Sequence, residues 1–253
     1  MKPHDFPQAA PQRPADPTPL ELAIHNYEVA CVKYHNDKMS LECADISAEE
    51  RRKRLLAQER DWKHLQQRKR ALAVHAQLQS ELEQYRAENS QKPPKELEKE
   101  AHHPTTKLTK HLFAVGEPQP SPKHAAHHII MGKGRHRVQL MATARFNLHM
   151  YGIGINDPVN GVWLAHNRKN SEYWRVPEST SDKPKHWATP ESPVHLTIHG
   201  KNYEQWIGRL FGDFNIPEHS FRNRLRDTKL KLRFGGYPAQ IEEKYDATWS
   251  GKS

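Results

Sequence analysis

Residues 123–130 read Lys-His-Ala-Ala-His-His-Ile-Ile, and this stretch constrains the fold of the chain more than any other. Two adjacent histidines lead into two β-branched residues, which is typical of a buried strand. Side chains alternate between the faces of a strand, so His127 and His128 point in opposite directions and cannot share one role. One imidazole can therefore bind a metal ion while the other meets water or substrate.

A second Ala-His-His sequence stands at residues 101–103. Pro104 follows it, Lys- and Glu-rich sequence precedes it, and no apolar run is available there for burial. Because proline also removes a backbone donor, this copy is not expected to form a strand. We therefore predict that His102 and His103 belong to a solvated linker and take no part in any chemistry.

The chain is basic and polar, with a formal net charge of +9 at pH 7 and a mean hydropathy of −0.97. This charge indicates a polyanionic partner, either nucleic acid or an acidic protein.

Cys31 and Cys43 have no CxxC spacing and predict no disulfide framework. No apolar run approaches the length of a membrane span, and the N-terminus lacks the apolar core of a signal peptide. We expect synthesis in the cytoplasm, no membrane partner, and any export by a route without a cleaved signal.

The N-terminal half is predicted to be mainly helical. Residues 1–18 are rich in Pro, Gln and Ala and are expected to be disordered. Residues 19–90 carry apolar side chains at helical spacing, which predicts a helical hairpin or coiled coil with a break at Asn36-Asp37. Ser47 followed by Glu50 resembles a capping box that opens the second helix.

The C-terminal half is predicted to be a separate α+β domain. Residues 91–118 are rich in Pro, Lys and His and indicate a linker that holds one short helix, with the domain itself spanning residues 119–253. The paired-histidine strand is followed by a helix over residues 136–151 and by Asn160-Gly161, a strong turn signal before a short strand. A polar excursion occupies residues 165–192.

His195 and His199 lie four residues apart. On a helix this spacing places both imidazoles on one face, within reach of one metal ion. On a strand they would lie about 13 Å apart, and Val194, Leu196 and Ile198 do alternate as in a strand. Ser192-Pro193, which suits a helix start, and the apolar stripe that follows favour the helix.

These motifs in this order resemble the ββα-metal fold of HNH (His-Me finger) endonucleases, and most closely the AHH nuclease family. The hallmarks stand here as Ala126-His127-His128, as Gly-Ile-Gly-Ile-Asn-Asp-Pro-Val-Asn-Gly-Val over residues 152–162, and as His-x-x-x-His-x-x-x-Tyr over residues 195–203. The resemblance covers about residues 123–211. It implies an α+β fold: an N-terminal helical hairpin or coiled coil, then a ββα-metal nuclease domain with an inserted helix. One departure is Ala165-His166, where a proline commonly stands.

The resemblance also implies a role for each site residue. His128 would be the general base that takes a proton from the attacking water, and Asn160 would tie the loop and orient that base. One divalent metal ion would be bound by three imidazoles, those of His127, His195 and His199. Imidazole ligands favour Zn²⁺ or Ni²⁺, whereas single-metal sites of this superfamily commonly use Mg²⁺ or Mn²⁺, so the choice stays open. Arg135, Arg137 and Arg145 would contact phosphates.

AHH domains often form the terminal module of bacterial polymorphic toxins and type VI secretion effectors. By resemblance, the substrate is nucleic acid, with DNA favoured over RNA, and the producing cell carries an immunity protein that we expect to be acidic. The N-terminal helices would bind a component of the secretion apparatus, and the toxin would act in the cytoplasm of the target cell.

Two other functions are consistent with the same residues. The chain would be a nucleic-acid-binding or adaptor protein if its ββα-metal fold were catalytically silent. It would be a structural zinc module if every histidine bound metal and none faced water. The intact set of histidines together with Asn160 favours the nuclease.

Overall fold

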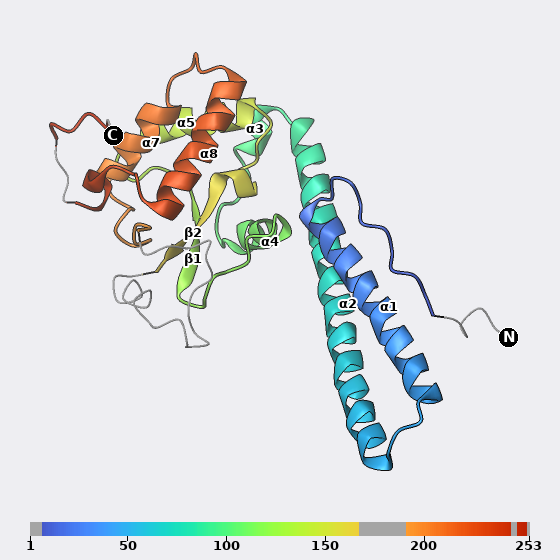
Figure 1. Cartoon of the computed structure of the whole chain (residues 1–253). Helices are drawn as coiled ribbons and strands as arrows, with labels where there is room; N and C mark the ends of the chain where they lie inside the picture. Colours follow the sequence, from blue (N-terminus) through green and yellow to red (C-terminus); the bar gives the residue numbers. More distant parts are fainter. Residues whose placement is uncertain (1–6, 167–190, 244–246, 252–253) are drawn as a thin grey trace. The chain divides into compact units, whose positions relative to one another are not determined.

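The computed structural model describes residues 7–166, 191–243 and 247–251. The chain divides into two compact units, Met1–Gln77 and Leu78–Ser253 (Figure 1). Within the described residues, no helix has the length and apolar character that crossing a bilayer requires.

The first unit is a pair of helices, as predicted. Helix α1 spans Pro19–Cys43, and helix α2 spans Ala48–Ser90 and continues into the second unit. The predicted cap at Ser47 is present, because its Oγ accepts the backbone N–H of Glu50 at 3.2 Å. The rings of Tyr34 and Trp62 pack with their centroids 5.5 Å apart and join the two helices.

The predicted break at Asn36-Asp37 is wrong, because α1 continues to Cys43. Both polar side chains make bonds compatible with a helix. Asp37 pairs with Lys33 one turn earlier at 2.5 Å, and the Asn36 amide exchanges two hydrogen bonds with the backbone of Gln8. Residues 7–18 contain no helix or strand, and the first six residues of the predicted disordered segment lie outside the described chain.

The second unit contains the two predicted strands, paired antiparallel. Strand β1 spans His124–His128 and strand β2 spans Gly161–Ala165, with His127 opposite Val162 and His128 opposite Gly161. Helix α5 (Val138–Met150) is inserted between them in the sequence and ends just before Gly152, whose φ is +67°. The fold is therefore mixed, with N-terminal helices and a small sheet in the C-terminal part, as predicted.

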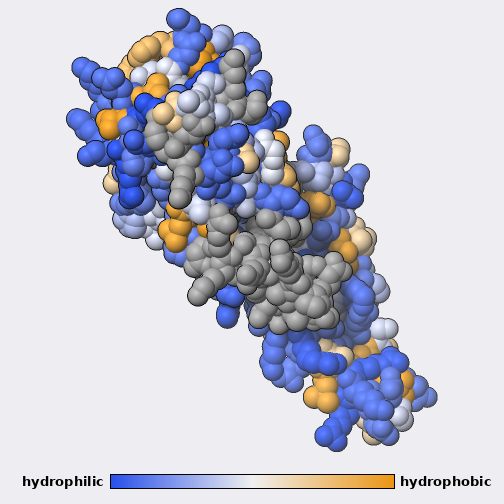
Figure 2. Space-filling view, turned by 90° about the vertical axis from the view of Figure 1, so that its left-hand side faces the viewer, coloured by the Kyte–Doolittle hydropathy of each residue, from blue (hydrophilic) through white to orange (hydrophobic). Residues whose placement is uncertain are grey.

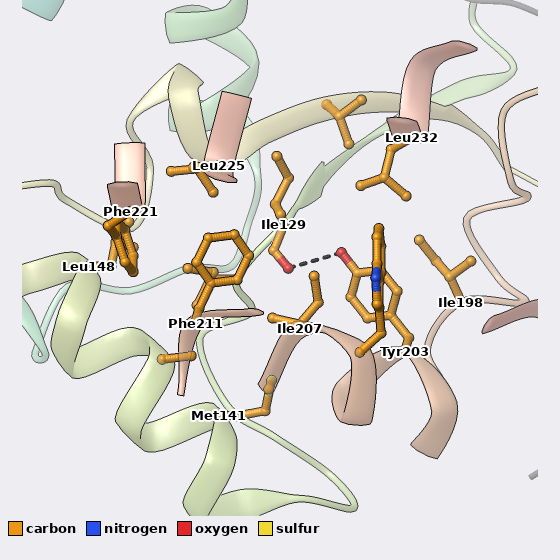
Figure 3. Packing of buried hydrophobic residues seen from close by; sticks show 14 of the residues in the cluster. Ile129, Met141, Leu148, Ile198, Tyr203, Ile207, Phe211, Phe221, Leu225 and Leu232 are labelled. Atoms are coloured by element: carbon orange, nitrogen blue, oxygen red, sulfur yellow. Dashed lines mark hydrogen bonds between the residues drawn. The ribbon is translucent and has the colours of Figure 1, made fainter. Parts of the chain in front are cut away.

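The two faces of the sheet pack against different helices. One face meets α7 (Lys201–Phe211) and α8 (Glu218–Phe234), with α5 completing the main core. Figure 3 shows this core, in which Ile207 and Phe211 of α7 lie among Leu225 of α8 and Met141 of α5. The opposite face meets α4 (Thr106–Ala114), a short helix that the sequence also predicted.

The structure differs from the predicted linker over residues 91–118. Besides α4, this segment forms α3 (Pro94–Leu97), and Leu97, Leu108 and Leu112 are buried. Leu108 and Leu112 pack against Trp163 and Ala126 on the sheet, so this stretch belongs to the core of the second unit. The segment is polar overall and has few apolar residues, so its sequence did not predict burial. Those few apolar side chains nevertheless pack on one face of the sheet.

The predicted helix over His195 and His199 is also wrong, because α7 begins only at Lys201, after Gly200 as N-cap. Ser192 does not cap a helix, since its Oγ donates to the carbonyl of Arg233. Residues 194–198 form one isolated turn, in which the amide of Thr197 donates to the carbonyl of Val194 at 3.0 Å.

The remaining described elements are two 3₁₀ helices, η1 (Pro158–Asn160) just before β2 and η3 (Ala239–Glu242) after α8. Most of the predicted excursion, residues 167–190, lies outside the described chain. Figure 2 shows that hydrophilic residues dominate the visible face of the molecule and that apolar residues appear there only in small patches.

Candidate active site

Three histidines meet on the α7 face of the sheet. His127 projects from β1, His195 lies in the isolated turn, and His199 lies between that turn and α7. One ring nitrogen from each residue lies within 4.8 Å of the others, which suits a common metal ion. The structure thus brings together all three predicted ligands, although by a turn rather than by a helix.

A tyrosine determines which nitrogen of His127 is available. The hydroxyl of Tyr203 donates to the carbonyl of Ile129 at 2.9 Å (Figure 3). It has no second proton, so it must accept the N–H of His127 Nε2, which lies 3.0 Å away. The lone pair is then on Nδ1, a buried atom without a hydrogen-bond partner in the described part of the chain. A histidine that donates one N–H to a fixed acceptor and leaves the other nitrogen bare is typical of a metal ligand.

The other two imidazoles have a spacing that also suits metal binding. Nε2 of His195 and Nε2 of His199 lie 3.2 Å apart. Two nitrogens bound tetrahedrally to one Zn²⁺ would lie roughly 3.3 Å apart. The turn is secured at its start, because the amide of His195 donates to the carbonyl of Ala165 at the end of β2 at 2.8 Å. These residues fit a divalent metal ion with borderline-soft character.

Burial keeps these imidazoles neutral. It lowers the pKa of His127 well below its ordinary value and that of His195 to about 4. Burial also lowers the pKa of His199, and neighbouring Arg135 acts in the same direction. A metal ligand must present an unprotonated nitrogen, so these three side chains are in the binding form at neutral pH.

His128 lies on the opposite face of β1 and is held by Asn156. Its Nε2 lies 3.0 Å from Oδ1 of Asn156. The orientation of that amide is clear, because its Nδ2 donates to the carbonyl of Ala101 and to the carboxylate of Glu100, both at 3.0 Å. Oδ1 must therefore accept, which places the proton of His128 on Nε2 and a lone pair on Nδ1. Burial lowers the pKa of His128 to about 4, so this base is unprotonated at neutral pH.

Glu100 connects this arrangement to α2. Its carboxylate also accepts hydrogen bonds from Tyr85 and from Lys107, each at 2.8 Å. Burial by itself would raise the pKa of Glu100, but the bonds from Lys107, Asn156 and Tyr85 together lower it. The carboxylate therefore stays charged and fixes the amide that positions His128.

Asn160 ties the loop, as predicted, but it does not contact His128. Its Oδ1 accepts the amide of Ile130 at 2.8 Å, and its Nδ2 donates to the carbonyls of Ile130 and Ile155, both at 3.0 Å. These bonds join the end of β1 to the loop before β2. The contact that orients the base belongs to Asn156 instead.

The three predicted phosphate-binding arginines have different environments. Arg135 is exposed and lines the cleft described below, whereas Arg137 does not. Arg145 is half-buried and its guanidinium donates to the backbone carbonyls of Gly132, Glu98 and Glu100. These bonds give Arg145 a role in holding the backbone, and its predicted contact with a phosphate has no support in the structure.

A cleft of about 980 Å³ exposes the site. Its walls include His127, His195 and His199 as well as His128, so both faces of β1 reach one opening. Two further histidines line it, and these are His102 and His103. The ring centroids of both lie within 6.4 Å of the His128 ring. The prediction that this second Ala-His-His sequence belongs to a free linker is wrong. Asn156 binds the carbonyl of Ala101 and Arg145 binds that of the preceding Glu100, although the His103 side chain is exposed.

Sequence reasoning missed several residues that hold the site. Glu204 is buried and its carboxylate accepts the backbone amides of Arg135, His136 and Arg137, which fixes the loop before α5. Asn156 stands inside the Gly-Ile-Gly-Ile-Asn-Asp sequence, which was a usable signal. Tyr203 closes the His-x-x-x-His-x-x-x-Tyr motif. Glu100 and Glu204 gave no signal, since a single glutamate in a polar sequence is commonplace.

Comparison with known proteins agrees with this geometry. Residues 108–232 match the model of AHH, a nuclease family of the HNH/ENDO VII superfamily with conserved AHH. No curated protein and no solved structure shows a significant match to the chain. The match contains both strands, the three clustered histidines and His128. The C-terminal region of the chain therefore carries an AHH nuclease domain of the HNH/ENDO VII superfamily.

Proposed function

We propose that this nuclease is a metal-dependent endonuclease that hydrolyses phosphodiester bonds, with DNA as the favoured substrate. One observation carries the proposal. His127 and His128 stand on opposite faces of one strand, yet both line the same cleft, one within a three-imidazole cluster and the other on an asparagine. A metal ligand set and a separate base are thus available to a single phosphate.

The proposed proton transfer starts at His128. Its Nδ1 takes a proton from water as the water oxygen bonds to phosphorus and the bond from phosphorus to the leaving oxygen breaks. The resulting imidazolium is stabilised by the Nε2–H bond to Asn156. Asn156 keeps its orientation because Glu100 and the carbonyl of Ala101 hold its amide. Arg135, exposed at the cleft, supplies positive charge for a phosphate.

His127, His195 and His199 would hold one divalent ion. When bound, such an ion polarises the scissile phosphate and stabilises the charge that develops on the leaving oxygen. Tyr203 and the carbonyl of Ile129 engage Nε2 of His127, which leaves its buried Nδ1 as the nitrogen available to an ion. Imidazole ligands favour Zn²⁺ or Ni²⁺ by softness, and Mg²⁺ and Mn²⁺ remain the alternatives to compare.

We further propose that the chain is an antibacterial toxin of the kind that AHH domains form in polymorphic and type VI secretion systems. The net charge of +9 suits both a polyanionic substrate and an acidic immunity protein. Helix α1 and the larger part of α2 form a compact unit of their own, which suits binding to a component of the secretion apparatus. The toxin would be made in the bacterial cytoplasm, leave without a signal peptide and act in the cytoplasm of the target cell.

The structural zinc alternative is disfavoured by His128. Structural zinc sites are closed by four protein ligands, whereas the fourth histidine here is held by Asn156 on the other face of the strand. A three-ligand set beside a cleft is typical of a catalytic ion. The silent adaptor alternative predicts binding without cleavage.

Incubation of the purified full-length chain with plasmid DNA and with structured RNA tests the proposal. The chain should be freed of metal first and then supplied separately with Zn²⁺, Ni²⁺, Mn²⁺ or Mg²⁺. We expect cleavage that requires one of these ions and is lost in His128→Ala. Binding without cleavage under every condition would favour the adaptor. Expression in a bacterial cytoplasm, with chromosome integrity as the readout, tests the toxin.

A further inference from the structure

The second Ala-His-His sequence has a well-defined position beside the cleft. Residues 98–103, called the 98–103 segment below, run along the part of the core that holds His128. Arg145 donates to the carbonyls of Glu98 and Glu100 at 2.5 and 3.2 Å. Asn156 donates to the carbonyl of Ala101 at 3.0 Å. These bonds come from α5 and from the loop before η1, so the segment is secured by two separate elements.

The imidazoles of this segment face the same opening as the proposed base. The ring centroids of His102 and His103 lie 6.2 and 6.4 Å from that of His128, and 4.5 Å from each other. A phosphate attacked by a water at His128 would therefore lie within reach of both rings. His103 is exposed at the cleft, and His102 is half-buried.

Gly132, in the loop after β1, lies directly against the His102 ring. A Cβ atom added at Gly132 would lie 2.3 Å from both Cγ and Nδ1 of His102. The carbonyl of the same glycine accepts a hydrogen bond from Arg145. The guanidinium of Arg145 thus binds both the backbone of the 98–103 segment and the glycine that leaves room for the His102 ring, so the position of this ring is fixed from two sides.

We propose that His102 and His103 bind a phosphate of the nucleic-acid strand next to the scissile phosphate, and so position the strand for attack at His128. Every protonation state of imidazole carries at least one N–H donor, and a phosphate oxygen is a strong acceptor. Lys133 and Arg135 line the same cleft and add positive charge. Both histidines lie outside residues 108–232, the region that matches the AHH family, so the match itself gives them no role.

The inference rests on the proposed nuclease function, and binding can be measured apart from cleavage. Affinity is measured by fluorescence anisotropy with a labelled 20-base-pair DNA duplex, using the full-length chain in a His128→Ala background with the activating ion present. His103→Ala should weaken binding about tenfold, and the pair His102→Gln with His103→Ala by about tenfold to a hundredfold, the range for a hydrogen bond to a charged group. With His128 intact, the same changes should raise KM and leave kcat nearly constant.

Substitution chemistry separates hydrogen bonding from base stacking. His103→Asn keeps an N–H donor and should restore much of the affinity, whereas His103→Phe keeps only a flat ring and should not. Recovery with Phe but not with Asn would show that the segment stacks on a base, and the proposal would be overturned. His219→Ala is the matched control, since His219 is exposed on α8 and does not line the cleft.

Three outcomes would overturn the inference. They are unchanged affinity in the double variant, a fall in kcat at constant KM, and a loss of metal affinity in titrations with Zn²⁺. A wild-type chain that binds the duplex but never cuts it would contradict the nuclease mechanism. The anisotropy comparison of the variants would still decide whether His102 and His103 bind a phosphate. A wild-type chain that cuts DNA with the double variant unaffected would retain the nuclease and remove only the role of His102 and His103.

Discussion

The two Ala-His-His sequences reach the same cleft by different means. The copy in β1 is positioned locally, because its strand pairs with β2 and alternation sends His127 and His128 to opposite faces. The copy in the 98–103 segment has no strand, and Arg145 and Asn156 hold its backbone from elsewhere in the sequence. A histidine in a polar, proline-flanked stretch can therefore be as well placed as one in a strand, provided that distant side chains fix its backbone.

Removing the 98–103 segment together with α4 should have the largest effect on this comparison. A fragment of residues 119–253 loses the partners of Trp163 and Ala126, namely Leu108 and Leu112, each of which is fully buried. Losing a buried leucine side chain costs about 2–5 kcal/mol, and a domain has only about 5–15 kcal/mol in total. We expect this fragment to be unfolded or molten by circular dichroism, and the fragment of residues 78–253 to be folded. A native thermal transition in the shorter fragment would show that the 98–103 segment and α4 are accessory.

Replacing His128 and replacing His103 should change different kinetic constants, so that the two Ala-His-His sequences can be told apart. His128→Ala should lower kcat by about 10²–10⁴-fold, because general base catalysis contributes that much, while the metal content measured by elemental analysis stays unchanged. Replacement of His103 should act on KM instead. If His128→Ala loses its metal, then His128 belongs to the ligand set and the two faces of β1 have been assigned wrongly.

Asn156 contacts both Ala-His-His sequences, through His128 and through the carbonyl of Ala101, so its loss should affect both. Asn156→Ala removes the acceptor for His128 and the donor to Ala101, and we expect kcat to fall by about 10–100-fold, the range for a residue that orients a functional histidine. The matched control is Asn147→Ala, since Asn147 is equally buried but bonds to the carbonyls of Phe211 and Asp213 away from the cleft. Both variants should lose stability in urea denaturation, and only Asn156→Ala should lose kcat in the folded state.

A methyl group at Gly132 should disturb only the second copy. Gly132→Ala pushes against the His102 ring, so we expect a rise in KM of roughly three- to tenfold. In the His102→Ala background the methyl has room, and the same change should have little further effect. A double-mutant cycle on KM measures this coupling, and strictly additive effects would contradict the packing.

Acid should weaken the strand that carries the first copy. Burial lowers the pKa of His124, the first residue of β1, to about 4, against about 6.5 for an unfolded chain. Between these values the unfolded state binds more protons than the folded state. The free energy of unfolding should therefore be fully supported by this group above pH 6.5 and fall as the pH drops toward 4, by about 1–3 kcal/mol. Urea denaturation at several pH values measures this slope. His124→Gln should make the slope shallower without removing it, because burial lowers the pKa of His128 and of His195 to about 4 as well. An equal slope in that variant would place the acid sensitivity elsewhere.

Much of the site followed from local pattern. The paired histidines before Ile129 and Ile130, the Asn160-Gly161 turn and the four-residue spacing of His195 and His199 each specify a short-range geometry. They predicted both strands and the proximity of His195 to His199, whereas the grouping of His127 with this pair came from the resemblance to the AHH family. The spacing succeeded even though the helix did not form, because a single turn brings residues four apart together as effectively as a helix does.

Only the tertiary structure assigned the partners. Asn156 was inside a recognised motif but could be given its role only once its amide was seen between His128 and the 98–103 segment. The arginines look alike in sequence, yet Arg145 binds backbone carbonyls while Arg135 lines the cleft. The sequence by itself determined the short-range features: which side chains alternate along a strand, where the chain turns, and which residues lie close because they are four apart. Hydrogen bonds between segments tens of residues apart decided the rest, because the direction of a polar side chain depends on which distant donors and acceptors the packed core leaves within its reach.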